Sequence, residues 1–316
     1  MSTEKRNENF MLKQSRYSKG KKNVKQYSKN NASKKSGSGK NSYNAYYKKN
    51  DDGFQPKSNG KSNYGKKKYP SKSKGYPKKN AQKPSIKIAF LGGLNEIGKN
   101  ITLVECENDI IIIDCGMAFP DGDMLGVDLV IPDFTYIEQN ADRVKGIILT
   151  HGHEDHIGGL PFLLSKVNVP IYGTPLTLGL VGNKLKEHSL YNQSQLNVIN
   201  AGQSIKLGCM KIDFSHVNHS IPDAVAFAIH TPCGTIVHTG DFKIDCTPIT
   251  GDMIDLSSFA RVGDEGVLAL LSESTNAERP GYTPTERTVS DSLDNLFKSA
   301  ENYRIIIATF ASNVNR

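Results

Sequence analysis

The sequence predicts an α/β fold of stacked, mixed β-sheets flanked by helices, which follows a long basic tail. Two observations support this prediction. The composition changes sharply near residue 84, and beyond it strand-like and helix-like segments are interspersed, with several strands at hairpin spacing. Antiparallel hairpins combined with helices favour stacked sheets covered by helices over a purely alternating parallel fold. The 232 residues after the tail are long enough for a large core.

Residues 1–84 form the first predicted domain, a basic tail. They carry 24 Lys+Arg and 4 Asp+Glu, a net charge of +20, whereas residues 85–316 carry 16 and 28, a net charge of −12. The tail has few aliphatic residues, so it cannot bury enough apolar surface to offset its chain entropy, and we expect disorder. It is either a solubilising segment or a tether for RNA. Its lysines would neutralise phosphates and its tyrosines would stack on bases, which favours the tether. The candidate RNA-binding residues are Lys66, Lys67, Lys68 and Tyr69.

Ordered elements are expected from residue 85 onward. The opening strands follow one another through a glycine-rich loop at residues 92–98 and a turn at residues 107–109, which together predict a β-meander. The expected strands are residues 85–91, 100–105, 110–114, 144–149, 170–172, 204–207, 211–216, 224–230, 234–238, 266–271 and 304–309, the last of them buried. The expected helices are residues 135–142, 159–166, 175–188 and 286–300.

Cysteine usage and hydropathy indicate the cellular compartment of the protein. The five cysteines are scattered through strand-like segments and contain no C-x-x-C pair, which is typical of buried thiols in a reducing environment. The chain has no run of about 18 apolar residues, and its first residues have no apolar signal core. We therefore expect a cytoplasmic protein that does not bind a membrane.

The residues that carry chemistry are concentrated directly after the strand expected at 144–149. His151, His153, Asp155 and His156 place three imidazoles and one carboxylate within six residues, a dense set of nitrogen and oxygen ligands suited to Zn²⁺. Two histidines two residues apart in an extended loop project to the same side and can hold one ion. Asp155 and His156 turn into the start of a helix and can reach a second ion.

The pattern H-x-H-x-D-H after an apolar strand resembles the signature of the metallo-β-lactamase superfamily. The other motifs of that superfamily follow in order, with Asp114 after the strand 110–113, His219 in the segment 217–222 and Asp241 in the segment 238–243. The resemblance implies an αββα sandwich in which Asp114 orients a metal ligand, His219 binds metal and Asp241 bridges both ions.

Several further sequence segments are similar to those of the ribonuclease J family. They are residues 92–100, 219–223, 239–243, 274–278 and 309–313. The resemblance implies a metallo-β-lactamase domain at residues 85–282 and the beginning of an inserted β-CASP domain at residues 283–316. Ser312 and Asn313 are candidate RNA contacts on this basis. Glu273 resembles the first motif of the inserted domain, where family members often have Asp.

The resemblance also implies a mechanism, a substrate and an assembly. Two Zn²⁺ ions would activate a water for attack on a phosphodiester, with His151, His153 and His219 on one ion and Asp155, His156 and the shared Asp241 on the other. Asp155, His156 and Asp241 are the catalytic candidates. The substrate would be single-stranded, 5′-monophosphorylated RNA, cut by exonuclease or endonuclease activity in RNA processing and decay. The full-length protein is expected to be a homo-oligomer.

Two alternatives stay open. A small-molecule hydrolase would share the first ligands but would not need the basic tail. The family completes its second metal site and its proton donor with histidines beyond residue 316, so the chain is also compatible with a truncated, catalytically incomplete RNA-binding fragment. Histidines outside the motifs are weaker candidates. His216, His188 and His230 are expected to have no metal role, and His238 either supports a ligand or is an ordinary strand residue.

Overall fold

The structure is a computed structural model that describes residues 84–310 and residue 312. The chain divides into two units, Met1–Lys74 and Gly75–Arg316, and all described residues lie in the second. The tail candidates Lys66, Lys67, Lys68 and Tyr69, and also Asn313, therefore lie outside the described residues. Within the described part, no helix is long and apolar enough to cross a lipid bilayer.

The first sheet of the described part is mixed. Its strands, in spatial order, are β1 (Ile86–Gly92), β2 (Ile101–Cys106), β3 (Asp109–Ile113), β4 (Val144–Ile148), β5 (Ile171–Gly173) and β6 (Leu196–Val198). The first three strands form an antiparallel meander, and the strands from β3 to β6 pair in parallel. The parallel pairs are separated along the chain by helices, because a parallel strand must begin again at the same end of the sheet.

The second sheet of the described part pairs mostly antiparallel strands. In spatial order they are β11 (Val267–Leu271), β10 (Gly234–His238), β9 (Val225–Thr231), β8 (Met210–His216) and β7 (Ser204–Leu207). Only the pair of β10 and β11 is parallel among these strands. The helix α5 (Leu256–Glu265) provides the crossover between those two strands.

Alternate side chains of one central strand enter two different cores. Ile110 and Ile112 of β3 pack toward α1 (Thr135–Gln139), α3 (Leu160–Leu164) and α4 (Pro175–Glu187), whereas Ile111 and Ile113 pack toward the second sheet. Successive strand residues point to opposite faces, so a run of four isoleucines buried on both sides marks a strand between two layers.

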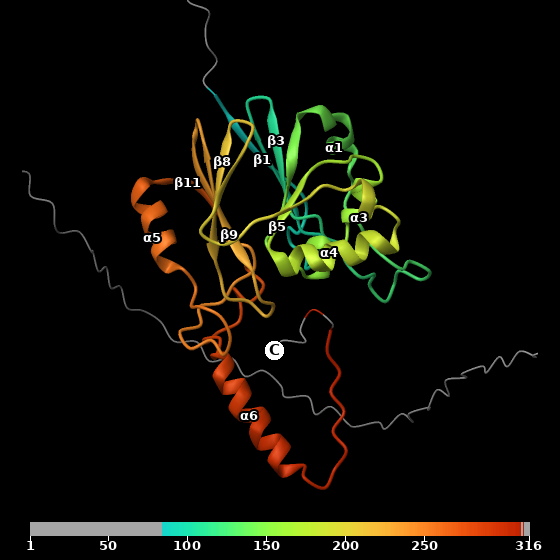
Figure 1. The fold of residues 1–316 in the computed structure, drawn as a ribbon, viewed down its shortest axis with the longest axis vertical. Helices are drawn as coiled ribbons and strands as arrows, with labels where there is room; N and C mark the ends of the chain where they lie inside the picture. Colours follow the sequence, from blue (N-terminus) through green and yellow to red (C-terminus); the bar gives the residue numbers. More distant parts are fainter. Residues whose placement is uncertain (1–83, 311, 313–316) are drawn as a thin grey trace, which may run out of the picture. The chain divides into compact units, whose positions relative to one another are not determined.

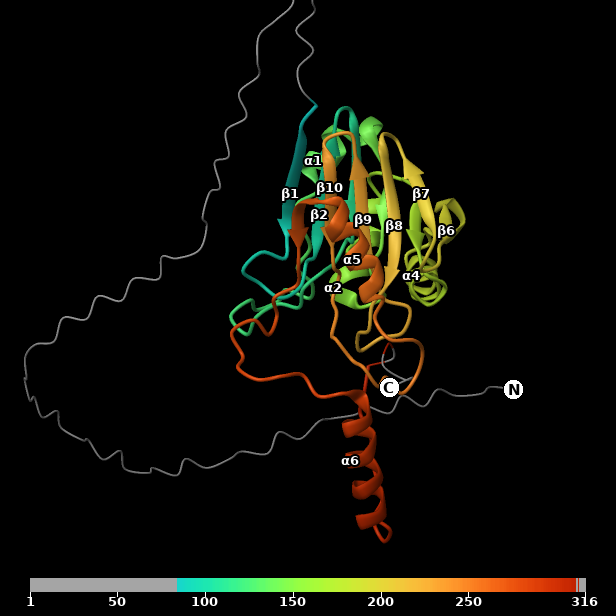
Figure 2. The same ribbon diagram turned by 90° about the vertical axis from the view of Figure 1, so that its left-hand side faces the viewer.

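The layers are therefore helix, sheet, sheet and helix. Figure 1 shows α1, α3 and α4 on the outer side of the first sheet, and Figure 2 shows α5 in front of β8 and β9 on the outer side of the second. Val262 of α5 packs on Ala228 and Val237 of the second sheet, which closes the fourth layer. The predicted class, stacked mixed sheets flanked by helices, is confirmed.

Most predicted elements form within a residue or two of their expected bounds, but several were missed. The missed elements are β6, α5 and the 3-10 turns Ala141–Arg143 and Tyr191–Gln193. The helix start expected at Asp155 and His156 forms the short helix α2 (Glu154–Ile157), which is separate from α3. The buried strand predicted at 304–309 is wrong. These residues follow α6 (Glu286–Ser299) as irregular chain, and Ile306 is 86% exposed, because no described strand lies beside them to pair with their backbone.

Candidate metal centre

The motif residues converge at one end of the sandwich although they are far apart in sequence. His151 and His153 lie in the loop that leaves β4, and Asp155 and His156 lie on α2, which follows at once. The loops after β8 and β10 contribute the remaining two side chains, His219 and Asp241. Loops that leave different strands at the same end of a layered fold lie close together, which explains the convergence.

Three histidines form the first group of candidate metal ligands, called the first ligand group below. Nε2 of His151 is 3.0 Å from Nδ1 of His153, and Nε2 of His219 is 3.2 Å from the same Nδ1 atom. Four ligands at the usual zinc–nitrogen distance of about 2.0–2.1 Å from a tetrahedral ion are separated by roughly 3.3 Å. The two observed distances are close to this value, and all three nitrogen atoms lie within 4.8 Å of one another. The three nitrogen atoms therefore fit a single tetrahedral ion.

The second ligand group surrounds His156. Its Nε2 atom is 3.5 Å from a carboxylate oxygen of Asp155 and 3.5 Å from one of Asp241. Among the described residues, His151, His156 and Asp241 also offer ligand atoms that all lie within 4.8 Å of one another. The same Asp241 oxygen lies 3.7 Å from Nε2 of His219, so this carboxylate stands between the two groups.

Burial and neighbouring charges set the protonation of these ligands. Burial, followed by the neighbouring histidines, lowers the pKa of His151 well below its usual value. Burial likewise lowers the pKa of His219 to about 4, although Asp241 opposes the shift. Burial works against ionisation of Asp155 and Asp241, but hydrogen bonding to His156 lowers the pKa of both carboxyl groups. Burial opposes protonation of His156, but Asp114 and the two carboxylates beside it raise its pKa well above the usual value. Neutral imidazoles and ionised carboxylates are the forms that bind metal, so binding at His156 would release a proton.

Asp114 and Thr150 support the ligands from behind. Asp114 is 2% exposed and accepts hydrogen bonds from the backbone N–H of Thr150 at 2.8 Å and from its hydroxyl group at 2.8 Å. The other partner of Asp114 is Nδ1 of His156, also at 2.8 Å. A proton on Nδ1 leaves the lone pair of Nε2 directed at the second ligand group, because a neutral imidazole carries only one N–H.

The backbone of α2 is held by two other segments. Asn100 donates its backbone N–H to the carbonyl oxygen of Asp155 at 3.0 Å, and Cys115 donates to that of His156 at 2.8 Å. The side-chain amide of Asn100 also lies 3.3 Å from a carboxylate oxygen of Asp155. Sequence reasoning treated Asn100 as the start of a strand and missed this contact. The contact of Thr150 with Asp114 was also missed. The position of Thr150 directly before the first histidine of the motif was the signal that could have indicated it.

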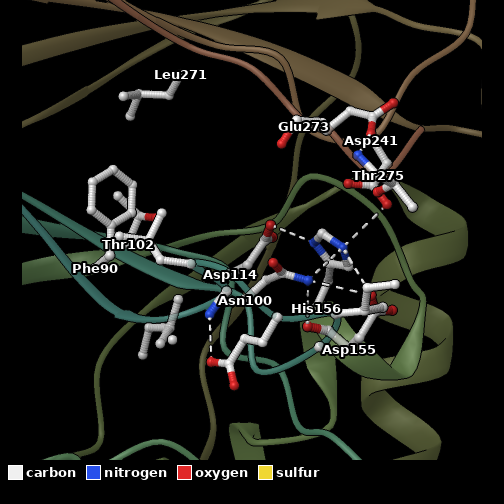
Figure 3. A pocket seen from close by; sticks show the side chains of 18 of the residues that line it. Phe90, Asn100, Thr102, Asp114, Asp155, His156, Asp241, Leu271, Glu273 and Thr275 are labelled. Carbon is white, nitrogen blue, oxygen red and sulfur yellow. Dashed lines mark hydrogen bonds and ion pairs between the residues drawn. The ribbon is translucent and has the colours of Figure 1, made fainter. Parts of the chain in front are cut away.

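A cavity of about 610 Å³ opens beside the second ligand group. Figure 3 shows Asp155, His156 and Asp241 on one side of this cavity and Phe90, Thr102 and Leu271 on the other. Glu273 also lines the cavity. Its backbone N–H donates to the hydroxyl oxygen of Thr239 at 3.2 Å, and its carboxylate accepts from the backbone N–H of Thr275 at 2.9 Å.

Other candidate residues lie away from this centre. His216 contacts the carbonyl oxygen of Asp252 at 3.0 Å, and His230 contacts Asp213 at 3.0 Å. His188 follows the last residue of α4 and packs its ring against Phe162. Ser312 lies beyond α6 at the end of the described chain, where it is half-buried.

Comparisons with known proteins agree with this geometry. The family model described as "Metallo-beta-lactamase superfamily" matches residues 94–282. The chain is 47% identical over 239 residues to ribonuclease J2 of Bacillus subtilis, covering 76% of this chain and 42% of the relative. It is 49% identical over 231 residues to ribonuclease J 1 of Streptococcus pyogenes, covering 73% of this chain and 41% of that relative. The chain thus spans about two fifths of the length of these curated relatives.

A solved structure supports the fold alone. A protein of unknown function from Enterococcus faecalis superposes with a TM-score of 0.54 at 17% identity, covering 73% of this chain and 61% of that chain.

Proposed function

We propose that this chain, which belongs to the metallo-beta-lactamase superfamily and its ribonuclease J family, carries the metal-binding part of a ribonuclease. The ribonuclease would hydrolyse RNA phosphodiesters with two divalent cations. One observation carries the proposal: two ligand groups lie side by side and the Asp241 carboxylate stands between them.

The donor set favours zinc at the first group. His151, His153 and His219 offer three nitrogen atoms, and imidazole ligands in tetrahedral geometry suit Zn²⁺. Asp155, His156 and Asp241 form a more oxygen-rich second group. Two divalent cations, when bound, supply a nucleophilic water at neutral pH and neutralise charge on the phosphate. The residues of the chain fix the positions of these side chains, and burial favours the neutral form of His151 and His219, which is the form that binds metal.

RNA is the proposed substrate because the curated relatives are named ribonucleases. The cavity of about 610 Å³ next to the second group has room for a nucleotide. We include in the proposal a single-stranded, 5′-monophosphorylated substrate and a homo-oligomeric full-length protein. A small-molecule hydrolase is the competing function, and no described feature favours it.

Metal analysis combined with an RNA assay tests the proposal. Asp241→Ala should lower the metal content of both groups and reduce cleavage of a 5′-monophosphorylated oligoribonucleotide by at least about 100-fold, because one carboxylate serves two ions. His188→Ala is the matched control, since this histidine lies outside the centre, and should leave metal content and cleavage unchanged. Protein purified without chelator that contains no transition metal would contradict the proposal. So would an Asp241→Ala variant with full metal content.

A further inference from the structure

We propose that His238 is a substrate-contacting residue whose Nε2–H group donates a hydrogen bond to a phosphate oxygen of the bound nucleotide. The inference rests on the proposed function and adds a residue to it. His238 is the last residue of β10 and lines the cavity beside the second ligand group. It precedes Asp241 by three residues but makes none of the ligand contacts described above.

The hydrogen bond to Gly240 determines which ring nitrogen of His238 carries the proton. The backbone N–H of Gly240 donates to Nδ1 of His238 at 3.1 Å. A backbone N–H can only donate, so Nδ1 must be the unprotonated, accepting nitrogen of the ring. A neutral His238 therefore carries its proton on Nε2, and this N–H group is a donor.

Packing holds the ring of His238 in place. His238 pairs with Phe227 on β9 and with Leu271 on β11, so it has a strand on each side. Its ring lies 6.1 Å from the ring of Phe227 at an interplanar angle of 30°. Burial lowers the pKa of His238, which keeps the ring neutral and leaves Nε2 as its only N–H donor. A donor that is held rigidly loses little entropy when a ligand binds.

The chemistry of the cavity explains what such a donor would do. Apart from His238 and from two members of the second ligand group, Asp155 and Asp241, its solvent-accessible titratable lining consists of carboxylates, which accept hydrogen bonds and repel a phosphate. They are Glu96, Glu273 and Glu278. The side-chain amide of Asn100 is already directed at Asp155 and His156. A neutral N–H donor that adds no negative charge therefore complements a phosphate oxygen in this cavity.

Three substitutions separate the functions of the ring. His238→Phe keeps an aromatic ring against Phe227 but removes both nitrogen atoms. His238→Asn keeps an acceptor near Nδ1 for the Gly240 N–H but removes the donor at Nε2. His238→Gln places an amide N–H near the position of Nε2. His230→Phe is the matched control, because His230 lies on the same sheet and its Nε2 atom contacts the carboxylate of Asp213.

Binding of uridine 5′-monophosphate and of uridine to the metal-loaded protein, measured by calorimetry, tests the contact without cleavage. We expect His238→Phe and His238→Asn to weaken nucleotide binding roughly tenfold, as for the loss of one hydrogen bond to a charged group. His238→Gln should retain most of the affinity, and His230→Phe should match the wild type. Uridine binding and metal content should be the same in all variants, and KM for RNA should follow nucleotide affinity.

Other results would overturn the inference. Imidazole ¹⁵N shifts that place the proton of His238 on Nδ1 would exclude the donor. Equal nucleotide affinity in the wild type, His238→Phe and His238→Asn would exclude the contact. Loss of metal in these variants, or an equal loss of uridine affinity, would assign His238 a different role. Nucleotide binding that depends on His238 in a protein that does not cleave RNA would contradict the proposed function but support the contact.

Discussion

Asp114 connects local backbone strain to the geometry of the metal centre. Its φ angle is +59°, in the left-handed region that residues other than glycine rarely adopt. Such a conformation costs on the order of 1–3 kcal/mol and persists only where the surroundings enforce it. Here the backbone N–H of Asp114 donates to the carbonyl oxygen of Ile148 at 3.0 Å, and its carboxylate binds Thr150 and His156. The strained turn directs the carboxylate back toward the motif.

Asp114→Asn should weaken metal binding without unfolding the protein. The amide retains one acceptor oxygen, so it can no longer accept all three hydrogen bonds, from the backbone N–H and the hydroxyl group of Thr150 and from Nδ1 of His156, as the carboxylate does. Loss of such a supporting partner typically reduces metal affinity by about 10–100-fold. Competitive chelator titration of the variant and the wild type would measure this change, with circular dichroism as the control for folding. Unchanged metal affinity in a folded variant would show that His156 is oriented by other contacts.

At the scale of elements, the segment 115–117 fixes the position of α2. Cys115 and Met117 donate backbone hydrogen bonds to the carbonyl oxygens of His156 and Glu154, at 2.8 Å and 3.3 Å. Gly116 lies between them in such close contact that a Cβ atom there would stand 1.6 Å from the carbonyl oxygen of Asp155. The absence of a side chain at residue 116 is therefore required for the approach of α2.

Gly116→Ala should displace α2 and with it Asp155 and His156. Overpacking of this kind typically costs about 1–3 kcal/mol, and more where the contact is with backbone. We expect a lower melting temperature and reduced metal content. Gly263→Ala is the control, because nothing lies within 4 Å of a Cβ atom at residue 263. Alanine in that helix should be neutral or stabilising. Equal melting temperatures for the two variants would contradict the proposed close approach.

Glu105 makes the first sheet sensitive to pH. Burial opposes its ionisation, but hydrogen bonds from Lys87, Arg143 and Tyr136 outweigh burial and lower the pKa to about 2 from an ordinary value of 4.5. A carboxyl group whose pKa is depressed in the folded state stabilises the protein above its unfolded pKa, and this contribution disappears as the pH falls through the folded pKa. The contribution of Glu105 is therefore complete above about pH 5 and lost toward pH 2.

Glu105→Gln should lower the free energy of unfolding by roughly 1–3 kcal/mol at pH 7, because Arg143 loses its charged partner. The difference from the wild type should shrink between about pH 4.5 and pH 2. Urea unfolding across this range would measure it. Glu138→Gln removes an exposed ion pair with Lys166 and should have little effect at any pH. A pH-independent difference for Glu105→Gln would contradict the pKa shift.

At the scale of the whole molecule, charge is divided between two parts of the chain. Residues 1–84 carry a net charge of +20 and contain none of the candidate ligands, whereas residues 85–316 carry −12. Deleting residues 1–84 should weaken RNA binding and flatten its dependence on salt, because fewer counterions are released. The measurement is the slope of log affinity against log salt concentration. Metal content should not change. An unchanged slope would leave the tail without an electrostatic role in RNA binding.

The sequence alone was sufficient to predict the order of most strands and helices and a cluster of candidate metal ligands. The apolar run Ile110 to Ile113, and the density of His151, His153, Asp155 and His156, are local properties. Local periodicity survives in any arrangement of the elements, so it can be interpreted without coordinates. The resemblance to a known family extended the prediction to Asp114, His219 and Asp241, which the structure brings to the same end of the sandwich.

Tertiary structure alone decided which distant residues touch. Asn100 reaches Asp155 across 55 residues, and Gly116 contacts the same backbone, because the β-meander brings the start of β2 and the end of β3 beside α2. It also decided against the strand predicted at 304–309. A strand is stabilised by hydrogen bonds to a neighbour and not by its own sequence, so apolar residues without a described neighbour remain exposed. Contacts of this kind depend on topology, which no local pattern encodes.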